Sequence, residues 1–365
     1  MWSVIGHAPA LAALERALAS ERPAHTWLFS GPEGVGKRHA AIEFAAALNC
    51  TGPDPDGAKA PSLRGWSRPC GDCRDCRDTL AGRHPDVELL EPGGICEEPE
   101  HRDHAESREL RICQVRRLER VLSLSPYSGR RRVAVVDAAD TLRAEAANAF
   151  LKTLEEPPEG CVIVLLAERE ERLPETVISR CQRLAFRPLP RPVLEEALRA
   201  RGATPEQAEA IAAAAAGRVG WALRALEDAS LLAGRRQMLD EAVRLAHAGR
   251  VERFAWAREA ASRAGEVRER YLRELAVWEE WWRDVLVAGA AKPGALEGES
   301  GRGLSEPVLS EEGKLYAAAD VVAFLRALVK TREYLQENVD PQLALENLTL
   351  DLPTPNVARR PVGAS

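Results

Sequence analysis

The stretch GPEGVGKR, residues 31–38, decides the fold. It follows an apolar segment, Thr26–Ser30, and opens a helical pattern that runs through Leu48. A strand, a glycine-rich loop with the spacing GxxxxGK and a helix form the Walker A arrangement, in which backbone amides hold phosphate groups and the lysine reaches the terminal one. We therefore predict an α/β nucleotide-binding domain. Its predicted nucleotide-binding residues are Gly31, Gly34, Gly36 and Lys37.

Two further apolar segments extend this prediction. Arg132–Val136 and Cys161–Ala167 are continuous apolar runs, and helical stretches separate them from Thr26–Ser30 and from each other. Apolar strands that alternate with helices are typical of βαβ units, whose parallel sheet is buried on both faces. With a first helix at about Ala8–Leu18, residues 1–187 are predicted to form this domain.

The phosphate loop departs from the active pattern at two positions. Arg38 stands where a serine or threonine usually ligates magnesium, and its guanidinium has no acceptor and carries a positive charge. The segment RVAVVDAAD, residues 132–140, resembles a Walker B strand with Asp137 as the magnesium-associated carboxylate. Ala138 follows it, and a methyl group cannot take a proton from attacking water. We expect ATP and Mg²⁺ to be poorly organised, and hydrolysis to be lost.

Four of the eight cysteines are grouped. Cys70, Cys73 and Cys76 have the spacing CxxCxxC, and Cys50 precedes them by twenty residues. Four thiolates suit tetrahedral zinc, and such a site is structural because no position remains for water. The alternative is a set of free cytosolic thiols. We predict a structural Zn²⁺ module at about residues 50–76, in which the metal orders the loop between the cysteines.

The remainder of the chain reads as helical. Residues 188–228 form a small helical domain, with a capping box at Thr204–Gln207. Residues 229–352 form a second helical domain, interrupted by a predicted long loop at Gly289–Gly313, and residues 353–365 read as a disordered tail. A helical stripe of tryptophans is interpreted as a buried seam between helices, with a partner-binding face as the alternative. Its members are Trp278, Trp281, Trp282 and Val285.

Composition limits the function classes. The 50 Lys and Arg residues and 56 Asp and Glu residues give a net charge of −6, which disfavours a protein that holds DNA alone through a basic patch. No run approaches eighteen apolar residues, and the first residues lack the apolar core of a signal peptide. We therefore expect a cytoplasmic protein with no membrane partner.

Strings along almost the whole chain resemble the clamp-loader subunits of the AAA+ family. The resemblance is strongest to the delta-prime subunit of bacterial DNA polymerase III and looser to its gamma/tau paralogue. The string NAFLKTLEEPP followed by SRCQ is specific to clamp-loader AAA+ proteins, and the cysteine cluster belongs to the same pattern. The matching strings are IGH at 5–7, HTWLFSGPEGVGK at 25–37, LNC at 48–50, GRHPD at 82–86, NAFLKTLEEPP at 148–158, TVISRCQ at 176–182 and NVDPQLALENLTLDL at 338–352.

The resemblance implies an architecture and partners. It implies an AAA+ domain at residues 1–187, a helical lid at 188–228 and an all-α collar domain for oligomerisation at 229–352. The implied function is a subunit of a heteropentameric ring that loads the sliding clamp onto primed DNA during replication. The implied partners are the gamma/tau motor subunits, the delta subunit, the sliding clamp through a weak contact, and primer-template DNA through the assembled complex.

The resemblance also implies one catalytic role in trans. Arg180, in Ser179-Arg180-Cys181, matches the arginine finger that such subunits extend into a neighbour's ATP site. From the residues alone it could equally be a surface arginine. Active relatives carry a small polar residue at the position of Glu168 and a sensing arginine at the position of Gly220. The residues that act in cis are therefore altered, whereas the residue that acts in trans is retained.

Three rival interpretations remain open. A catalytically active clamp-loader ATPase of the gamma/tau kind would have to tolerate Arg38 and Ala138. A stand-alone zinc-containing DNA-binding protein is disfavoured by the acidic balance. An AAA+ protein of branch migration or proteolysis is disfavoured by the LKTLEEPP and SRC strings.

Overall fold

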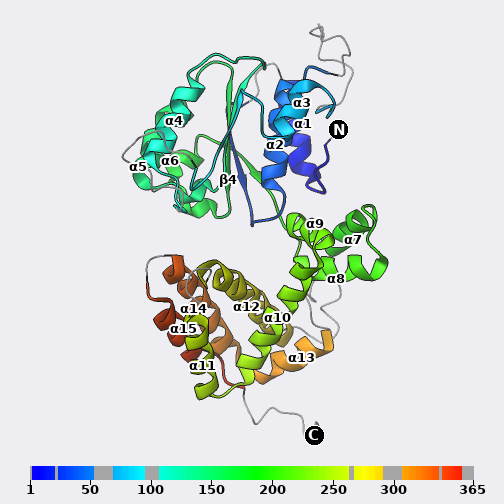
Figure 1. Cartoon of the computed structure of the whole chain (residues 1–365), viewed down its shortest axis with the longest axis vertical. Helices are drawn as coiled ribbons and strands as arrows, with labels where there is room; N and C mark the ends of the chain where they lie inside the picture. Colours follow the sequence, from blue (N-terminus) through cyan, green and yellow to red (C-terminus); the bar gives the residue numbers. More distant parts are fainter. Residues whose placement is uncertain are drawn as a thin grey trace. The chain divides into compact units, whose positions relative to one another are not determined.

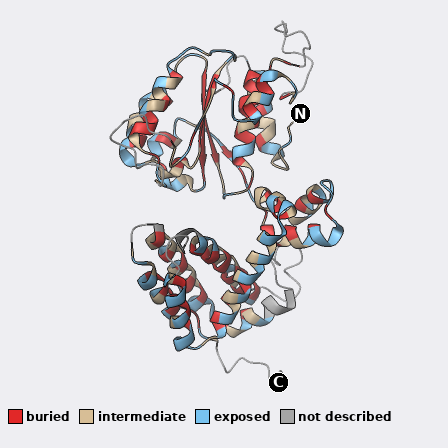
Figure 2. Cartoon of the chain, in the orientation of Figure 1, coloured by how far each residue is buried: buried red, intermediate tan, exposed pale blue. Residues whose placement is uncertain are grey.

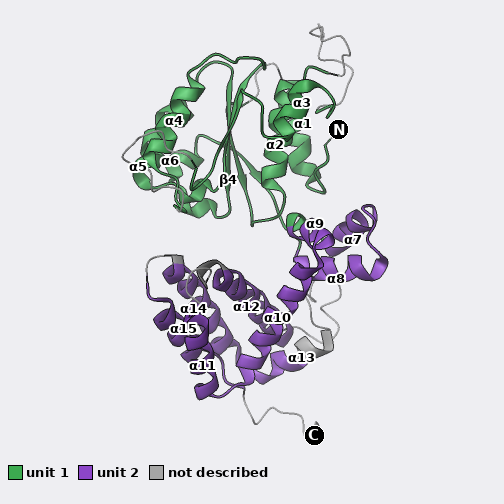
Figure 3. Cartoon of the chain, in the orientation of Figure 1, with its two compact units in different colours: residues 1–190, 217–220 green, residues 191–216, 221–365 purple. Residues whose placement is uncertain are grey.

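The computed structural model describes residues 2–20, 24–52, 69–94, 107–262, 267–290, 306–336 and 339–355. The chain divides into two compact units (Figure 3). Unit 1 comprises Met1–Pro190 and Gly217–Gly220, and unit 2 comprises Arg191–Ala216 and Trp221–Ser365. All the strands of the described residues lie in unit 1, and unit 2 is helical. The separation of a lid from a collar, expected near residue 228, stays a prediction.

Unit 1 contains a five-stranded parallel sheet, which confirms the predicted α/β architecture (Figure 1). The strand order is β2-β3-β4-β1-β5. The three predicted strands have the predicted bounds, whereas β2 and β5 were not predicted. The strands are β1 (Thr26–Ser30), β2 (Val87–Leu90), β3 (Arg132–Val136), β4 (Cys161–Ala167) and β5 (Gln182–Ala185).

Helices cover both faces of this sheet. Alternate residues of each central strand point to opposite faces, so that Trp27 and Phe29 join one core and Leu28 joins the other. The first core includes α1 (Ala8–Ala19) and α2 (Lys37–Asn49). The second core includes α4 (Ile112–Leu122), α5 (Ala144–Glu155) and α6 (Glu175–Ile178). Figure 2 shows the sheet buried between these layers. The shorter elements are α3 (Arg74–Leu80), η2 (Ala139–Thr141) and η3 (Glu170–Arg172).

A buried carboxylate fixes the loop that leads into β3. Asp86 accepts hydrogen bonds from the amides of Tyr127, Ser128 and Gly129, at 2.7, 2.8 and 2.7 Å, and pairs with the Arg132 guanidinium at 3.2 Å. Burial alone would raise the pKa of Asp86, but these donors outweigh it and lower the pKa. The loop between α4 and β3 is therefore held by a charged hydrogen-bonded network rather than by regular secondary structure.

Unit 2 is built from helices, with α9 beginning in unit 1. The predicted capping box is confirmed: the Thr204 hydroxyl accepts from the Gln207 amide at 3.2 Å, and the Gln207 side chain accepts from the Thr204 amide at 3.1 Å. The helices are α7 (Arg191–Arg199), α8 (Pro205–Ala215), α9 (Val219–Glu227), α10 (Ala229–His247), α11 (Arg250–Ser262), α12 (Val267–Ala290), α13 (Glu306–Leu315), α14 (Ala318–Gln336) and α15 (Pro341–Leu350).

The tryptophan stripe of α12 is a buried seam, as predicted. Trp278, Trp282 and Val285 are at most 1% exposed, and Trp281 is 3% exposed. Trp282 packs edge-on against Phe324 of α14, with ring centroids 5.3 Å apart. The alternative interpretation of this stripe as a partner-binding face is therefore wrong.

The predicted bounds of the loop at Gly289–Gly313 are wrong at both ends, because helices cover them. Helix α12 continues to Ala290 and α13 begins at Glu306, and residues 291–305 lie outside the described part of the chain. A Cβ atom on Gly289 would lie 2.6 Å from the Gly313 carbonyl oxygen. The sequence predicts that these glycines lie in a loop, whereas in the structure they let two helix backbones approach closely. The predicted tail, residues 353–365, lies outside the described residues from 356 onward.

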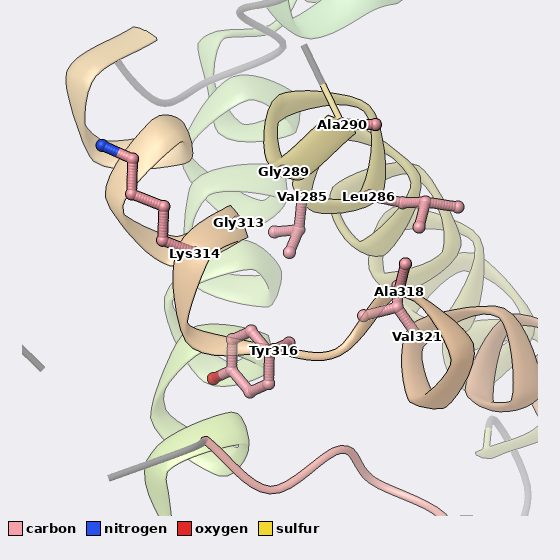
Figure 4. Close-up of a pocket in the computed structure, with 9 residues that line it drawn as sticks. All are labelled: Val285, Leu286, Gly289, Ala290, Gly313, Lys314, Tyr316, Ala318 and Val321. Carbon is pink, nitrogen blue, oxygen red and sulfur yellow. The ribbon is translucent and has the colours of Figure 1, made fainter. Parts of the chain in front are cut away.

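Beside this glycine contact lies a pocket of about 480 Å³ (Figure 4). Lys314 and Tyr316 supply the only polar side chains among its lining residues. Burial raises the pKa of the Tyr316 hydroxyl, so this group stays protonated at neutral pH. None of the predicted site residues lines this pocket.

Candidate functional site

The phosphate loop lies at the carboxyl end of β1 and has the backbone that its glycines allow. Gly31, Gly34 and Gly36 have φ angles of 147°, 78° and 108°. A Cβ atom on Gly31 would lie 1.9 Å from the Phe186 carbonyl oxygen, so that a larger residue does not fit at this position. Gly36 ends the loop, and α2 begins directly at Lys37. The strand, loop and helix predicted from GxxxxGK are therefore present.

The Lys37 ammonium is bound by its own loop. It donates to the carbonyl oxygens of Gly31 and Pro32, the second at 2.8 Å. Burial lowers the pKa of Lys37, and nearby carboxylates oppose this shift. The acidic neighbours are Glu168, Asp137, Asp140 and Glu33. Four carboxylates surround the one lysine of the loop, so the site is rich in negative charge.

Arg38 and Asp137 meet in this site. Arg38 Nη1 lies 3.2 Å from Asp137 Oδ2 and 3.0 Å from Glu91 Oε2. The sequence identified Arg38 and Asp137 as separate features, and the structure brings them together at the carboxyl ends of β1 and β3. The guanidinium therefore contacts the carboxylate that a magnesium ion would use in an active site.

The residues after β4 and the first residues of α9 also lie at this site. Asp140 accepts hydrogen bonds from the amides of Glu168 and Arg169, each at 3.2 Å. The Gly220 amide donates to the Gly34 carbonyl oxygen at 2.7 Å, and a Cβ atom on Gly220 would lie 3.2 Å from that oxygen. The backbone at position 220 thus packs on the phosphate loop itself, and any side chain there would crowd it.

The four predicted metal ligands converge. The sulfur atoms of Cys50, Cys70, Cys73 and Cys76 all lie within 4.8 Å of one another. A tetrahedral site with Zn–S bonds of about 2.3 Å places its sulfurs about 3.8 Å apart, so this cluster is close to that geometry. The backbone amides of Cys73 and Cys76 donate to the Cys70 and Cys73 sulfurs at 3.3 and 3.4 Å. A hydrogen bond from Cys76 lowers the pKa of Cys50. Four soft donors with amide support fit a zinc ion.

Sequence reasoning missed the residues that anchor this cluster. Asp75, in α3, accepts from the Thr51 hydroxyl at 3.0 Å and contacts His84 Nε2 at 3.3 Å. The Asp86 amide donates to His84 Nδ1 at 3.0 Å, so the proton of the ring lies on Nε2 and points to Asp75. Of these residues, the string GRHPD contains only His84 and Asp86, and its spacing gives no sign of a link to the cysteines.

Arg180 lies two residues after the end of α6, and its partners are different from those of the phosphate loop. Its guanidinium donates to the Glu155 carboxylate, with Nε 2.8 Å from Oε1, and to the Thr176 carbonyl oxygen at 2.7 Å. Its side chain is 33% exposed. The structure therefore presents this arginine on the surface of unit 1.

Comparison with known proteins identifies the family. A family model described as "DNA polymerase III, delta subunit" matches residues 6–190, just over half of the chain. The chain belongs to this family. The region of this DNA polymerase III delta subunit family member that matches the model, residues 6–190, contains the phosphate loop, the cysteine cluster and Arg180.

Curated relatives of this delta-family chain include subunits of two kinds. It is 31% identical to DNA polymerase III subunit delta' of Bacillus subtilis over 54% of this chain and 53% of that one. It is 37% identical to the delta' subunit of Pseudomonas aeruginosa over 52% of this chain and 50% of that one. It is also 32% identical to the tau subunit of Bacillus subtilis over 50% of this chain and 28% of that one. The chain spans about half the length, or less, of the curated relatives that it matches.

A solved structure gives a weaker likeness. A protein related to the DNA polymerase III gamma subunit, from Thermotoga maritima, has a TM-score of 0.45 and 18% identity, over 93% of this chain and 97% of that one. None of the helices in the described part of the chain is both long enough and apolar enough to cross a membrane.

Proposed function

We propose that this chain is the delta-prime subunit of a bacterial clamp loader. It takes part in a heteropentameric ring with gamma/tau motor subunits and a delta subunit, and helps to load the sliding clamp onto primed DNA. Its own phosphate loop does not hydrolyse ATP, and Arg180 acts in trans on a neighbouring motor subunit. A role in replication places it in the cytoplasm. The observation that carries this proposal is the ion pair between Arg38 and Asp137 in a site that otherwise keeps the phosphate-loop fold.

Three contacts support the loss of hydrolysis. The Arg38 guanidinium lies on Asp137, the carboxylate that would associate with magnesium. The Lys37 ammonium is held by two loop carbonyl oxygens. Glu168 adds a carboxylate near Lys37, where it would repel the phosphates of a nucleotide. Ala138 stands in place of the base, and its methyl group cannot take a proton from water.

The in-trans role of Arg180 is supported by its exposure. It is the arginine of the SRC string, 33% exposed at the end of α6, and outside the phosphate loop of its own chain. An arginine finger stabilises the charge that develops on a transferring phosphoryl group, and it can act from a neighbouring subunit. A chain with an altered site in cis and an exposed finger suits a subunit that completes another subunit's site.

A structural Zn²⁺ ion is part of the proposal. Cys50, Cys70, Cys73 and Cys76 would supply four thiolates, and zinc there would hold the module of residues 50–76 together. Residues 53–68 of this module lie outside the described part of the chain. We further propose that residues 188–228 act as the lid and residues 229–352 as the collar for oligomerisation. The gamma/tau and delta subunits are its direct partners, the sliding clamp is a weak one, and primer-template DNA meets it only through the complex.

The tau relatives favour a second candidate, a catalytically active subunit of the gamma/tau kind. The two candidates differ in ATP turnover by the purified chain. We expect no turnover above background from wild-type protein, and co-purification with the motor and delta subunits when all are co-expressed. Steady turnover that disappears with Lys37→Ala would instead establish the gamma/tau-like function. Failure to co-purify with either subunit would contradict both candidates.

A further inference from the structure

The proposed arginine finger has a carboxylate partner in its own chain. Arg180 Nε lies 2.8 Å from Glu155 Oε1, and Nη2 donates to the same oxygen. Nη1 donates to the Thr176 carbonyl oxygen at 2.7 Å and lies 3.3 Å from the Ser179 hydroxyl. A guanidinium has five N–H groups in a fixed plane. Glu155 therefore fixes the Nε side of the group, and Thr176 fixes one N–H at its tip.

Both partners are carried by rigid backbone. Glu155 is the last residue of α5, and Arg180 follows Ser179, the C-cap of α6. Leu154 of α5 and Val177 of α6 are 3% and 0% exposed and belong to the same core cluster. Glu155 is thus one residue from the buried Leu154, and Arg180 is three residues from the buried Val177. The direction of the guanidinium is set by a contact between two elements, not by either element alone.

The pair contributes little to the stability of the fold. The side chains of Glu155 and Arg180 are 48% and 33% exposed, and exposed ion pairs are screened by water and salt. The effect of this contact is on the rotamer of a long and flexible side chain, which Glu155 holds together with the Thr176 carbonyl oxygen. An arginine that must reach a phosphate in another subunit depends on that direction.

We propose that Glu155 is a positioning residue for Arg180, holding the guanidinium so that its Nη1 and Nη2 tips face a phosphate group of a neighbouring nucleotide. The inference rests on the proposed in-trans role and deepens it. Glu155 engages Nε and one N–H of Nη2, and the 3.3 Å contact with Ser179 is the weakest of the tip contacts. Phosphate oxygens displace that contact, while Glu155 keeps the plane of the guanidinium in place.

The chain offers a matched control for this carboxylate. Glu156 is adjacent, of the same chemistry and exposed, and no ion pair is described for it among the residues of the structure. A general effect of negative charge at the end of α5 would appear with both residues. An effect transmitted through Arg180 would appear only with Glu155.

The test is a double-mutant cycle in reconstituted clamp-loader complexes. DNA-stimulated ATP hydrolysis and clamp loading are measured for wild type, Arg180→Ala, Glu155→Ala, Glu155→Gln, Glu156→Ala and the double variant Arg180→Ala/Glu155→Ala. Gel filtration checks that all assemble equally. We expect Glu155→Ala to lose most of the hydrolysis rate that Arg180→Ala loses, and to lower kcat rather than raise KM. A displaced catalytic group can lower the rate up to about 100-fold at its own site. The whole-complex loss is smaller, since other sites still turn over.

The remaining variants distinguish an effect that acts through Arg180 from a general effect of charge. We expect Glu155→Gln, which keeps an acceptor oxygen, to recover part of the rate, and Glu156→Ala to match wild type. In the Arg180→Ala background, Glu155→Ala should cause no further loss. Two outcomes would contradict the positioning role alone and leave the proposed role of Arg180 in trans intact. In the first, Arg180→Ala is slow but Glu155→Ala matches wild type. In the second, Glu155→Ala lowers the rate equally with and without Arg180. If Arg180→Ala itself matches wild type, the proposed role in trans fails and the positioning role fails with it.

Discussion

Arg38 Nη1 lies 3.2 Å from Asp137 Oδ2, so that the side chain in place of a magnesium ligand is paired with the side chain that would hold magnesium. Asp137 is also close to Lys37, whose ammonium is bound by loop carbonyl oxygens. Arg38, Asp137 and Lys37 therefore each have a partner within the chain. This self-contained network leads to the first prediction.

We predict that magnesium does not strengthen nucleotide binding to the wild-type chain. Arg38→Thr should free Asp137 and introduce a hydroxyl, so that binding of a fluorescent ATP analogue becomes stronger with Mg²⁺ than without it. Arg38→Lys is the control, because it keeps the positive charge. Hydrolysis should not return with Arg38→Thr, since Ala138 and Glu168 remain. Binding of Mg²⁺-ATP by wild type that equals binding by Arg38→Thr would contradict the role assigned to Arg38.

The cysteine cluster should contain about one zinc ion per chain. Zinc is expected to remain after purification without added metal, and Cys73→Ser or Cys76→Ser should lose it. Structural zinc contributes roughly 10–16 kcal/mol in small zinc-finger peptides, so chelation should unfold this module first. Metal analysis and native alkylation measure this. Cys161→Ser is the control, as a buried thiol outside the cluster. Metal-free protein with four freely alkylated thiols would end the proposal.

Replacement of Asp86 should destabilise unit 1. Asp86→Asn removes a buried charge from Arg132 and turns an NH2 donor toward either the Tyr127 amide or the Ser128 and Gly129 amides, for a loss of about 3 kcal/mol. The lowered pKa of Asp86 gives stability that is present above the unfolded pKa of about 3.9, and that is lost as pH falls through the lower folded pKa. The difference between wild type and Asp86→Asn in urea unfolding should therefore be full at pH 7 and shrink below about pH 4. A difference independent of pH would contradict this account.

Two glycines in helices should respond to alanine with opposite signs. Gly289→Ala places a methyl group 2.6 Å from the Gly313 carbonyl oxygen, so we expect unit 2 to lose about 1–3 kcal/mol. Gly234→Ala, in α10, meets nothing within 4 Å and should gain about 0.5–1 kcal/mol through helix propensity. Thermal unfolding of both variants checks this. Equal effects would mean that the contact between α12 and α13 does not constrain position 289.

The sheet shows how far the sequence predicts this fold. The central strands β1, β3 and β4 are buried on both faces, so each is a continuous apolar run that is visible in the sequence. The edge strands β2 and β5 are only four residues long, and in β5 only Leu184 is buried. Neither has the apolar run or the clear alternation that a strand prediction requires.

The candidate site was predicted as residues and not as contacts. The spacing of the phosphate loop and of the cysteines is local, so it points directly to Lys37 and to the four cysteines that cluster in the structure. The pair of Arg38 and Asp137 joins residues 99 positions apart, and that of Glu155 and Arg180 joins residues 25 positions apart. Such partners depend on how strands and helices pack. No spacing rule in a single sequence reports them.

The loop before β3 links the cysteine cluster to the sheet in a way that amide exchange can follow. The amides of Tyr127, Ser128 and Gly129 are held by Asp86, and those of Arg130 and Arg131 by Asn49, the residue next to Cys50. Their protection from solvent deuterium therefore comes from side chains of distant segments and not from a helix or ladder. Any loosening around Cys50 would be reported by faster exchange at positions 130 and 131, so this loop is a natural reporter of the state of the cysteine cluster.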